Sequence, residues 1–483
     1  MEASGKIVSG AVVSAPAPQH FDDPAGDIFA MAAQAGRAFM AGDRPIVAKA
    51  PHLLEDLFGG GLPEAGHGAQ VTLQRLIEAG EAGALPSGRP EFFGYVVGGA
   101  HPVGVAADWL VSAWDQCAAV NDISPVAVAA EQTCQRWLVD LLGLPPQTVM
   151  GLTSGCTTAN LACLAAARHA QLRRFGWDVN SQGVAGAPPL RVLVGDSTHV
   201  SVWRCLRLLG LADQVTVVRA DGQGRMDPGH LAELASAGTG GLIVCGQVGS
   251  TDCGSVDPLA ELARITHEFG GWLHLDGAYG LWAASSPQLR PLLAGVELAD
   301  SWSCDAHKWL NTPYDCGLAF CADETALRGA LAIDAGYLDT PERKGRDPLD
   351  FRVEMSQRAR APMLWAVLHH LGRAGVAALV ERGCQAARHL ARRLDGQDGI
   401  RLLTPVVLNQ VLIHVGDLRH TRQVVEELNG SGTCWTTPTT WQGIPAIRMS
   451  VSNWRTDVGV MDRVAGQILD THALVGAAGP PTP

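Results

Sequence analysis

The chain has 483 residues, of which 47% are hydrophobic and 17% are charged, and this composition excludes a disordered chain. Its length exceeds that of one ordinary domain, so we expect a large domain with one or two smaller lobes. The formal net charge of −12 argues against nucleic acid or an anionic membrane surface as a partner, and it is typical of a soluble enzyme of small molecules.

Cysteine usage and the N-terminus indicate a cytoplasmic protein. None of the twelve cysteines forms a C-x-x-C pair, and most lie in apolar runs, as Cys134 and Cys163 do, which is typical of buried reduced thiols. The first residues lack the basic start and apolar stretch of a secretory signal. Residues 141–167 carry no charge, but their prolines and polar residues indicate protein interior rather than a membrane span. We expect no metal site.

Composition and periodicity divide the chain into five parts. The first and last residues mix Ala, Gly, Ser and Pro without periodicity, which predicts flexible tails. The predicted parts are a tail at 1–25, an N-terminal helical segment at 26–95, a large domain at 96–325, a loop, long helix and small C-terminal domain at 326–475, and a tail at 476–483.

From residue 128 onward, helical and strand patterns alternate. Cys134, Trp137, Leu138, Leu141 and Leu142 share one face of an amphipathic helix. Apolar runs then predict buried strands at 191–194, 215–218, 242–245, 272–276 and 317–321, with helices at 199–209, 228–235 and 257–269 between them. This alternation predicts an α/β fold with a mostly parallel central sheet and helices on both faces.

The C-terminal third changes character. A long helical pattern at 363–394 precedes strands at 410–415 and 447–451 and a last helix at 457–469. This order predicts a separate, small C-terminal α/β domain.

The first of four motifs is Thr153-Ser154-Gly155-Cys156-Thr157-Thr158-Ala159-Asn160, which precedes a helical run. Small residues and hydroxyls at a helix start leave backbone N–H groups free, and the helix dipole favours an anion there. A phosphate is the natural occupant, and an ordinary Ser/Thr N-cap is the alternative.

The second motif places Asp276 at the end of the apolar strand Trp272-Leu273-His274-Leu275-Asp276. An unpaired carboxylate is costly to bury, so Asp276 needs a cationic partner. A protonated pyridine nitrogen would serve, and a structural ion pair is the alternative.

The third motif is Ser303-Cys304-Asp305-Ala306-His307-Lys308-Trp309, between an apolar strand and an apolar turn. Desolvation should lower the pKa of Lys308, which favours Schiff-base chemistry. A surface lysine in a loop is the alternative.

The fourth motif, Asp196-Ser197-Thr198-His199, follows the strand at 191–194. The His199 imidazole at a strand end could stack on a flat cofactor ring, although a lone histidine is more often an incidental core or loop residue. The order of the four motifs, each at a strand edge, is more informative than any one of them.

At these residues the sequence resembles the group II pyridoxal-5′-phosphate (PLP)-dependent amino-acid decarboxylases, which include the aromatic-L-amino-acid and glutamate decarboxylases and have fold type I, the aspartate aminotransferase-like fold. The likeness runs from about residue 90 to 455 and includes the Asp305-Ala306-His307-Lys308-Trp309 box, Tyr314-Asp315-Cys316-Gly317 and Asn453-Trp454-Arg455.

The resemblance implies a role for each motif residue. Lys308 would hold PLP as a Schiff base, Asp276 would bind the pyridinium nitrogen, and His199 would stack on the ring. The remaining positions implied to lie at the cofactor are Cys156, Thr157, Thr251, Asp305 and His307.

The resemblance also implies a mobile lid with a catalytic tyrosine. Tyr337 falls on the tyrosine that protonates the substrate carbon after carbon dioxide leaves, and the stretch that follows it, 340–350, is rich in charge, Pro and Gly. Three positions depart from the family pattern: Cys156 replaces a Gly, Thr158 a Glu and Gln357 an Arg.

The substrate is expected to be an L-amino acid, with a preference for an aromatic one because Phe93 and Tyr95 could face its side chain. No basic residue for a distal carboxylate is evident. The family likeness implies a homodimer in which Cys117 and Ala119, smaller than the Ile and Phe of animal relatives, reach the partner's pocket.

Three other functions share this cofactor machinery. An aldehyde synthase, which couples decarboxylation to oxidative deamination, commonly lacks the loop tyrosine, so Tyr337 favours plain decarboxylation. An aminotransferase uses the same fold. A catalytically inactive assembly protein would not need the intact set of Lys308, Asp276 and His199.

Overall fold

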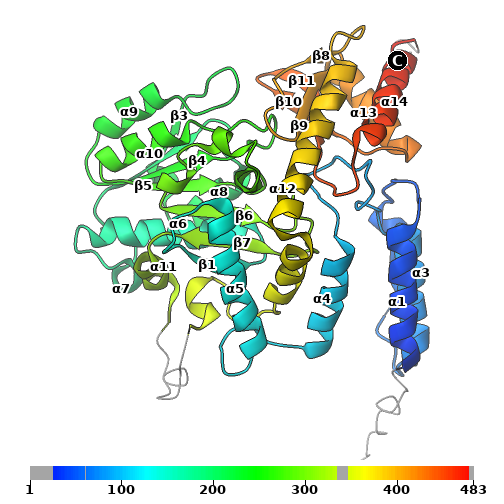
Figure 1. Ribbon diagram of the computed structural model, residues 1–483, viewed down its shortest axis with the longest axis horizontal. Coiled ribbons are helices and arrows are strands. Elements are labelled where there is room, and N and C mark those ends of the chain that lie inside the picture. The colour runs from blue at the N-terminus through cyan, green and yellow to red at the C-terminus, as the bar shows by residue number, and fades with distance from the viewer. Residues whose placement is uncertain (1–25, 60, 334–345, 478–483) are drawn as a thin grey trace, which may run out of the picture. The chain divides into compact units, whose positions relative to one another are not determined.

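The computed structural model describes residues 26–59, 61–333 and 346–477, and the chain forms two compact units, residues 1–86 and 87–483 (Figure 1). In the first unit, α1 (Gly26–Ala41) packs against α3 (Ala69–Gly83), and an ion pair joins Arg44 to Glu81 at 3.2 Å. Two short elements lie between them, η1 (Pro51–Leu53) and α2 (Glu55–Phe58). The predicted N-terminal segment of 26–95 extends beyond this unit, because residues 87–95 belong to the larger one.

The larger unit contains a seven-stranded sheet with the order β1-β7-β6-β5-β4-β2-β3. Only β7 among these strands runs antiparallel to its neighbours. The strands are β1 (Val149–Thr153), β2 (Leu190–Gly195), β3 (Val215–Val218), β4 (Gly241–Gln247), β5 (Trp272–Asp276), β6 (Ser301–Asp305) and β7 (Gly317–Cys321). The predicted α/β fold with a mostly parallel sheet is confirmed.

Helices cover both faces of the sheet because its strands are apolar on both sides. In β4, Leu242 and Val244 pack on one face, and Ile243 and Cys245 on the other. Burial of each large apolar side chain contributes about 1.5–3 kcal/mol relative to exposure. The first face carries α5 (Pro125–Leu142), α9 (Pro228–Ser236) and α10 (Leu259–Glu268), and the second carries α6 (Cys156–Arg173), α8 (Val200–Leu208) and α11 (Glu324–Leu331).

A smaller antiparallel sheet with the order β10-β11-β9-β8 forms the C-terminal domain. It is reached through α12 (Ala361–Leu394), which is kinked at Gly372, where φ is 58° and ψ is 178° (Figure 1). The domain comprises β8 (Arg401–Leu402), β9 (Gln410–His414), α13 (Leu418–Ser431), β10 (Thr437–Trp441), β11 (Ile444–Ser450) and α14 (Val458–Ala477).

By length and composition α12 could cross a membrane, a test that the core helices of soluble proteins also pass. Its buried residues pack in protein cores: Leu364 and Val380 belong to the main hydrophobic core, and Leu390 and Leu394 belong to the core of the C-terminal domain. The remaining elements are α4 (Pro102–Trp114), α7 (Val179–Gln182), η2 (Ala212–Gln214), η3 (Gly280–Ser285), η4 (Arg290–Leu293), η5 (Val296–Leu298) and η6 (Pro348–Phe351).

Candidate active site

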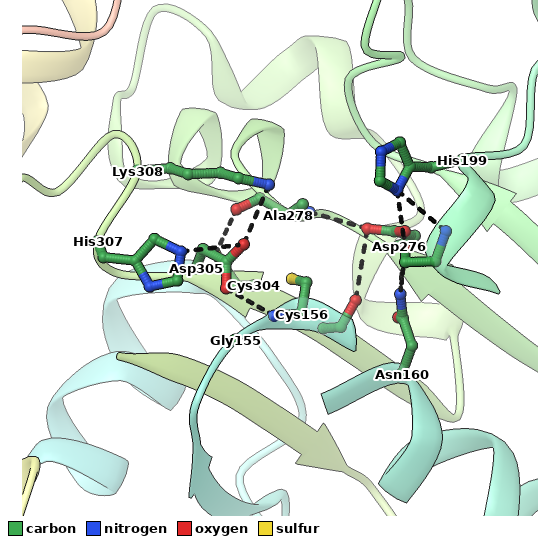
Figure 2. A network of polar contacts seen from close by, with 12 residues as sticks. Gly155, Cys156, Asn160, His199, Asp276, Ala278, Cys304, Asp305, His307 and Lys308 are labelled. Atoms are coloured by element: carbon green, nitrogen blue, oxygen red, sulfur yellow. Dashed lines mark hydrogen bonds and ion pairs between the residues drawn. The ribbon is translucent and has the colours of Figure 1, made fainter. Parts of the chain in front are cut away.

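Four chain segments meet at one edge of the main sheet. Strands β1, β2, β4, β5 and β6 run in the same direction, so their carboxyl ends share this edge, where open α/β sheets bind ligands. Figure 2 shows Lys308, His307, Asp305 and Cys156 on one side and Asp276, Asn160 and His199 on the other. The four predicted motifs are therefore brought together.

The helix that follows β1 begins without a side-chain cap. Its N-cap is Gly155, and Ser154 and Thr158 bond to each other through their hydroxyls at 3.0 Å. The backbone N–H of Cys156 donates to Asp305 Oδ1 at 2.7 Å, and Thr157 in the first turn is exposed. The alternative of an ordinary Ser/Thr N-cap is thus wrong, and the start of α6 suits an anion.

Lys308 lies in the turn after β6, and its backbone is tightly held. A Cβ atom on Gly98 would lie 1.9 Å from the Lys308 carbonyl oxygen, so only glycine fits there. Asn311 donates from Nδ2 to the carbonyl oxygens of Lys308 at 3.2 Å and Trp309 at 2.8 Å. These contacts aim the Lys308 side chain, which is 20% exposed, at Asp305, where Nζ lies 3.0 Å from Oδ2.

The expected lowering of the Lys308 pKa is wrong for this structure. Burial lowers the pKa, but the carboxylates of Asp305 and, more weakly, Asp276 raise it by more, so the net pKa lies above the ordinary lysine value. Desolvation alone would lower this pKa, but the carboxylate of Asp305, three residues upstream, outweighs it.

His307 is held as one tautomer. Its Nδ1 accepts a hydrogen bond from the Cys316 N–H at 3.0 Å, so the neutral ring carries its proton on Nε2, 3.6 Å from Asp305 Oδ2. Burial lowers the pKa of His307, against an opposing effect of Asp305, which favours this neutral form. Its ring packs on Tyr314 with centroids 4.2 Å apart.

Asp276 is a buried carboxylate without a cation. It is 5% exposed, its Oδ2 accepts from Asn160 Nδ2 at 3.1 Å, and its Oδ1 accepts from the Ala278 N–H at 3.1 Å. Ser303 Oγ lies 3.5 Å from Oδ1, and the ion pairs formed by the described parts of the chain do not include Asp276. The alternative of a structural ion pair is therefore wrong for these residues.

His199 is the N-cap of α8. Its Nδ1 accepts from the Ser201 N–H at 3.3 Å and lies 2.8 Å from Ser201 Oγ, which fixes an otherwise exposed ring. Partial removal of the ring from water lowers the pKa of His199 despite Asp276, and Lys308 and Arg448 add to that lowering. A neutral, exposed imidazole suits stacking on a flat ring.

One predicted substrate residue is excluded. Phe93 is fully buried in the core of the C-terminal domain, its N–H bonded to the Trp435 carbonyl, so it has no surface to offer a substrate. Tyr95 is 66% exposed and stays a prediction. Thr251 lies half-buried after β4, with no side-chain bond of its own among the described residues, and Tyr337 and most of the predicted lid lie outside them.

Two sets of residues at the site were not predicted from the sequence. Asn160 and His274 are fully buried, and both contact the Asp276 network, although they stood inside motifs chosen for other residues. Arg448, 9% exposed, lies near His199 and pairs with Asp252 at 3.7 Å. The period-two alternation of β5 was the signal available for His274; Arg448 had none.

These residues supply a matching group for each part of PLP. The uncapped α6 terminus suits a phosphate, Lys308 an aldehyde, and the cation-free carboxylate of Asp276 a protonated pyridine nitrogen. In Figure 2 the exposed His199 ring lies at the Asp276 end of the network, away from Lys308. No group of three His, Cys, Asp or Glu side chains in the described ranges could hold a metal ion.

Known proteins are similar to this chain in sequence and in fold. The chain matches the family model of the pyridoxal-dependent decarboxylase conserved domain over residues 82–414. Tryptophan decarboxylase 1 of Oryza sativa subsp. japonica is 29% identical over 437 residues, which cover 83% of this chain and 84% of that protein. The 4-hydroxyphenylacetaldehyde synthase of Rhodiola rosea is 26% identical over 433 residues, which cover 85% and 86%.

A crystal structure of Oryza sativa TDC with PLP and tryptamine matches with a TM-score of 0.87 and 25% sequence identity, covering 95% of this chain and 99% of that chain. The family model spans more than two thirds of the sequence, and the site contains the groups that PLP requires. The chain therefore belongs to the pyridoxal-dependent decarboxylase family and is a PLP-dependent carboxy-lyase.

Proposed function

We propose that the enzyme decarboxylates an aromatic L-amino acid to the corresponding amine and carbon dioxide. The observation that carries the reaction is that one site contains both Lys308 and the buried carboxylate of Asp276, which forms no ion pair with the described residues. The aromatic preference is supported by relatives named for tryptophan and for a 4-hydroxyphenyl product.

In this proposal each group has one task. Bound PLP supplies the sink for the electrons of the breaking Cα–carboxylate bond. Lys308 Nζ would hold the cofactor aldehyde, the start of α6 would hold the phosphate, and Asp276 would keep a proton on the pyridine nitrogen. His199 would cover the ring, and His307 places Nε2–H 3.6 Å from Asp305 Oδ2, beside the lysine. Tyr337 would return a proton to the substrate carbon.

Arg448 favours testing a second substrate class. A substrate with a distal carboxylate needs a cation, and Arg448 is a buried one whose Asp252 partner lies at 3.7 Å, longer than a hydrogen bond. An acidic amino acid would have to compete with Asp252 for this guanidinium. The aromatic class is preferred because Arg448 already has a partner.

A panel of L-amino acids tests the proposal. Purified enzyme with PLP is incubated with tryptophan, tyrosine, phenylalanine, glutamate and aspartate, and carbon dioxide, amine, aldehyde, ammonia and keto acid are measured. We expect amine and carbon dioxide in equal amounts from an aromatic substrate. Aldehyde with ammonia would indicate an aldehyde synthase, keto acid without carbon dioxide an aminotransferase, and no product from any substrate would contradict the proposal.

We also propose a homodimer in the cytoplasm. Large apolar side chains, each more than 40% exposed, are concentrated within residues 109–126, beside Cys117 and Ala119. They are Trp109, Leu110, Trp114, Ile123 and Val126. Sedimentation velocity should give twice the chain mass, and Leu110→Glu should shift it toward the monomer; a monomeric parent protein would contradict the dimer.

The proposed compartment rests on the cysteines. All twelve cysteines are free, which supports a reducing compartment.

A further inference from the structure

Alternation in β5 places three polar side chains on the face of the sheet that packs against α6. Leu273 and Leu275 point to the opposite core, whereas Trp272 belongs to the apolar cluster on the α6 side. His274 and Asp276 share that face by alternation, and both bond to Asn160 of α6. Ser301 of β6 is the register partner of His274, and Asn160 comes from α6. All five polar side chains are at most 5% exposed.

These five side chains form one continuous hydrogen-bond chain. Trp272 Nε1 lies 2.9 Å from Ser301 Oγ, and Ser301 Oγ lies 3.0 Å from His274 Nδ1. His274 Nε2 lies 2.9 Å from Asn160 Oδ1, and Asn160 Nδ2 lies 3.1 Å from Asp276 Oδ2. Asn160 Nδ2 also lies 3.4 Å from Ser201 Oγ, so the same amide reaches the residue that holds His199.

The two ends of the chain fix its direction. The indole N–H of Trp272 can only donate, and an ionised carboxylate at Asp276 can only accept. Between them, the Ser301 hydroxyl donates to His274 Nδ1, His274 donates from Nε2–H to Asn160, and the Asn160 amide donates to Asp276. This requires a neutral His274, and burial lowers its pKa to about 4.

We propose that Asn160 and His274 are positioning residues that hold the Asp276 carboxylate aimed at the pyridine nitrogen of PLP. The inference rests on the proposed role of Asp276. A hydrogen bond donated to a carboxylate favours its charged form, and a charged carboxylate is what keeps a neighbouring pyridine nitrogen protonated. Asn160 is therefore fixed by His274 in the one orientation that presents its N–H groups, and not its oxygen, to Asp276.

Cofactor affinity measures this role without reference to turnover. Apoenzyme is titrated with PLP, and the quenching of tryptophan fluorescence gives the dissociation constant. Asn160→Leu and His274→Phe should each weaken binding by about 10- to 100-fold, the loss expected for a hydrogen bond to a charged group. His274→Gln should recover most of the affinity, because its Nε2 can donate to Asn160 Oδ1.

Gln171→Leu is the matched control. Gln171 lies on the same helix, is 4% exposed, and bonds Leu242 N and Gly270 O at the amino ends of β4 and β5, away from the site. It should lower the melting temperature and leave the PLP dissociation constant within about two-fold of the parent value, because its partners, the two main-chain groups and the Arg174 guanidinium, are not residues of the site.

A PLP analogue with carbon in place of the ring nitrogen separates positioning from packing. Without a nitrogen to pair with Asp276, the parent enzyme and Asn160→Leu should bind the analogue within about two-fold of each other, in contrast to PLP. An equal weakening for both cofactors would overturn the inference, as would full PLP affinity in Asn160→Leu. Failure of the parent enzyme to become labelled at Lys308 after borohydride reduction would instead overturn the proposed function.

Discussion

Two carboxylates end neighbouring strands of the same sheet and have opposite surroundings. Asp305, the last residue of β6, pairs with Lys308 at 3.0 Å and lies 3.6 Å from His307 Nε2. Asp276, the last residue of β5, accepts hydrogen bonds from Asn160, Ala278 and Ser303 and forms no ion pair with the described residues. Both are nearly fully buried.

The same sheet edge therefore carries two kinds of carboxylate, one paired with a lysine and one that a cationic ligand can pair with. Asp305 is already paired with the Lys308 ammonium and accepts from the N–H of Cys156. Asp276 forms no ion pair with the described residues, and a carboxylate buried without a cation is costly. A ligand that carries both an electrophilic carbon and a cationic edge matches this asymmetry.

Removal of the Lys308 amine should have the largest effect on turnover. Lys308→Ala should lower turnover by about 10³-fold or more, because the attachment point of the cofactor is lost while Asp305 is left unpaired. Lys308→Arg keeps the charge next to Asp305 and should be equally inactive. Carbon dioxide release and borohydride labelling measure both effects; substantial turnover in either variant would contradict the role of the amine.

Removal of the charge on Asp276 should have the next largest effect. Asp276→Asn keeps the shape of the side chain and should lower kcat by about 10²- to 10³-fold, the usual loss for one preorganised electrostatic partner. Cofactor affinity should fall with it. Steady-state kinetics and the PLP dissociation constant are the measurements, and Asp276→Glu, which restores the charge, should lie between the two. A fully active Asp276→Asn would leave the buried carboxylate without a function.

Much of this site could be predicted from the sequence because strand ends coincide with motif residues. Asp276, Lys308 and His199 each follow an apolar run, and the parallel order of strands brings such ends together. The net pKa of Lys308 could not be predicted, since it depends on the distance from Asp305, and neither could the burial of Phe93, which depends on the C-terminal domain. Strand β6 was not predicted, because Ser301 and Ser303 interrupt its apolar residues.

The His274 chain should make stability depend on pH. Burial holds the pKa of His274 at about 4 in the folded state, whereas the pKa of an unfolded histidine lies near its ordinary value of 6.5. The unfolded state therefore binds more protons between these values, and stability should fall by up to about 3 kcal/mol as the pH drops from 6.5 to 4. Other groups titrate in this window too, so the test is the difference between parent and His274→Gln in urea unfolding at each pH. A constant difference would show that His274 is not held neutral.

The smallest effect should come from Asp305→Asn, which removes the anion beside Lys308 and keeps its shape. Because Asp305 raises the pKa of Lys308, the substitution should lower that pKa, and the deprotonated amine needed for attachment should become available at lower pH. The midpoint of the attachment rate against pH should move down by about one unit, with turnover of the loaded enzyme changed by less than about ten-fold. The absorbance of bound cofactor, followed after mixing apoenzyme with PLP at successive pH values, measures the shift. A midpoint that stays in place would mean that the ion pair in Figure 2 does not control the amine, and that the two carboxylates differ less than their contacts indicate.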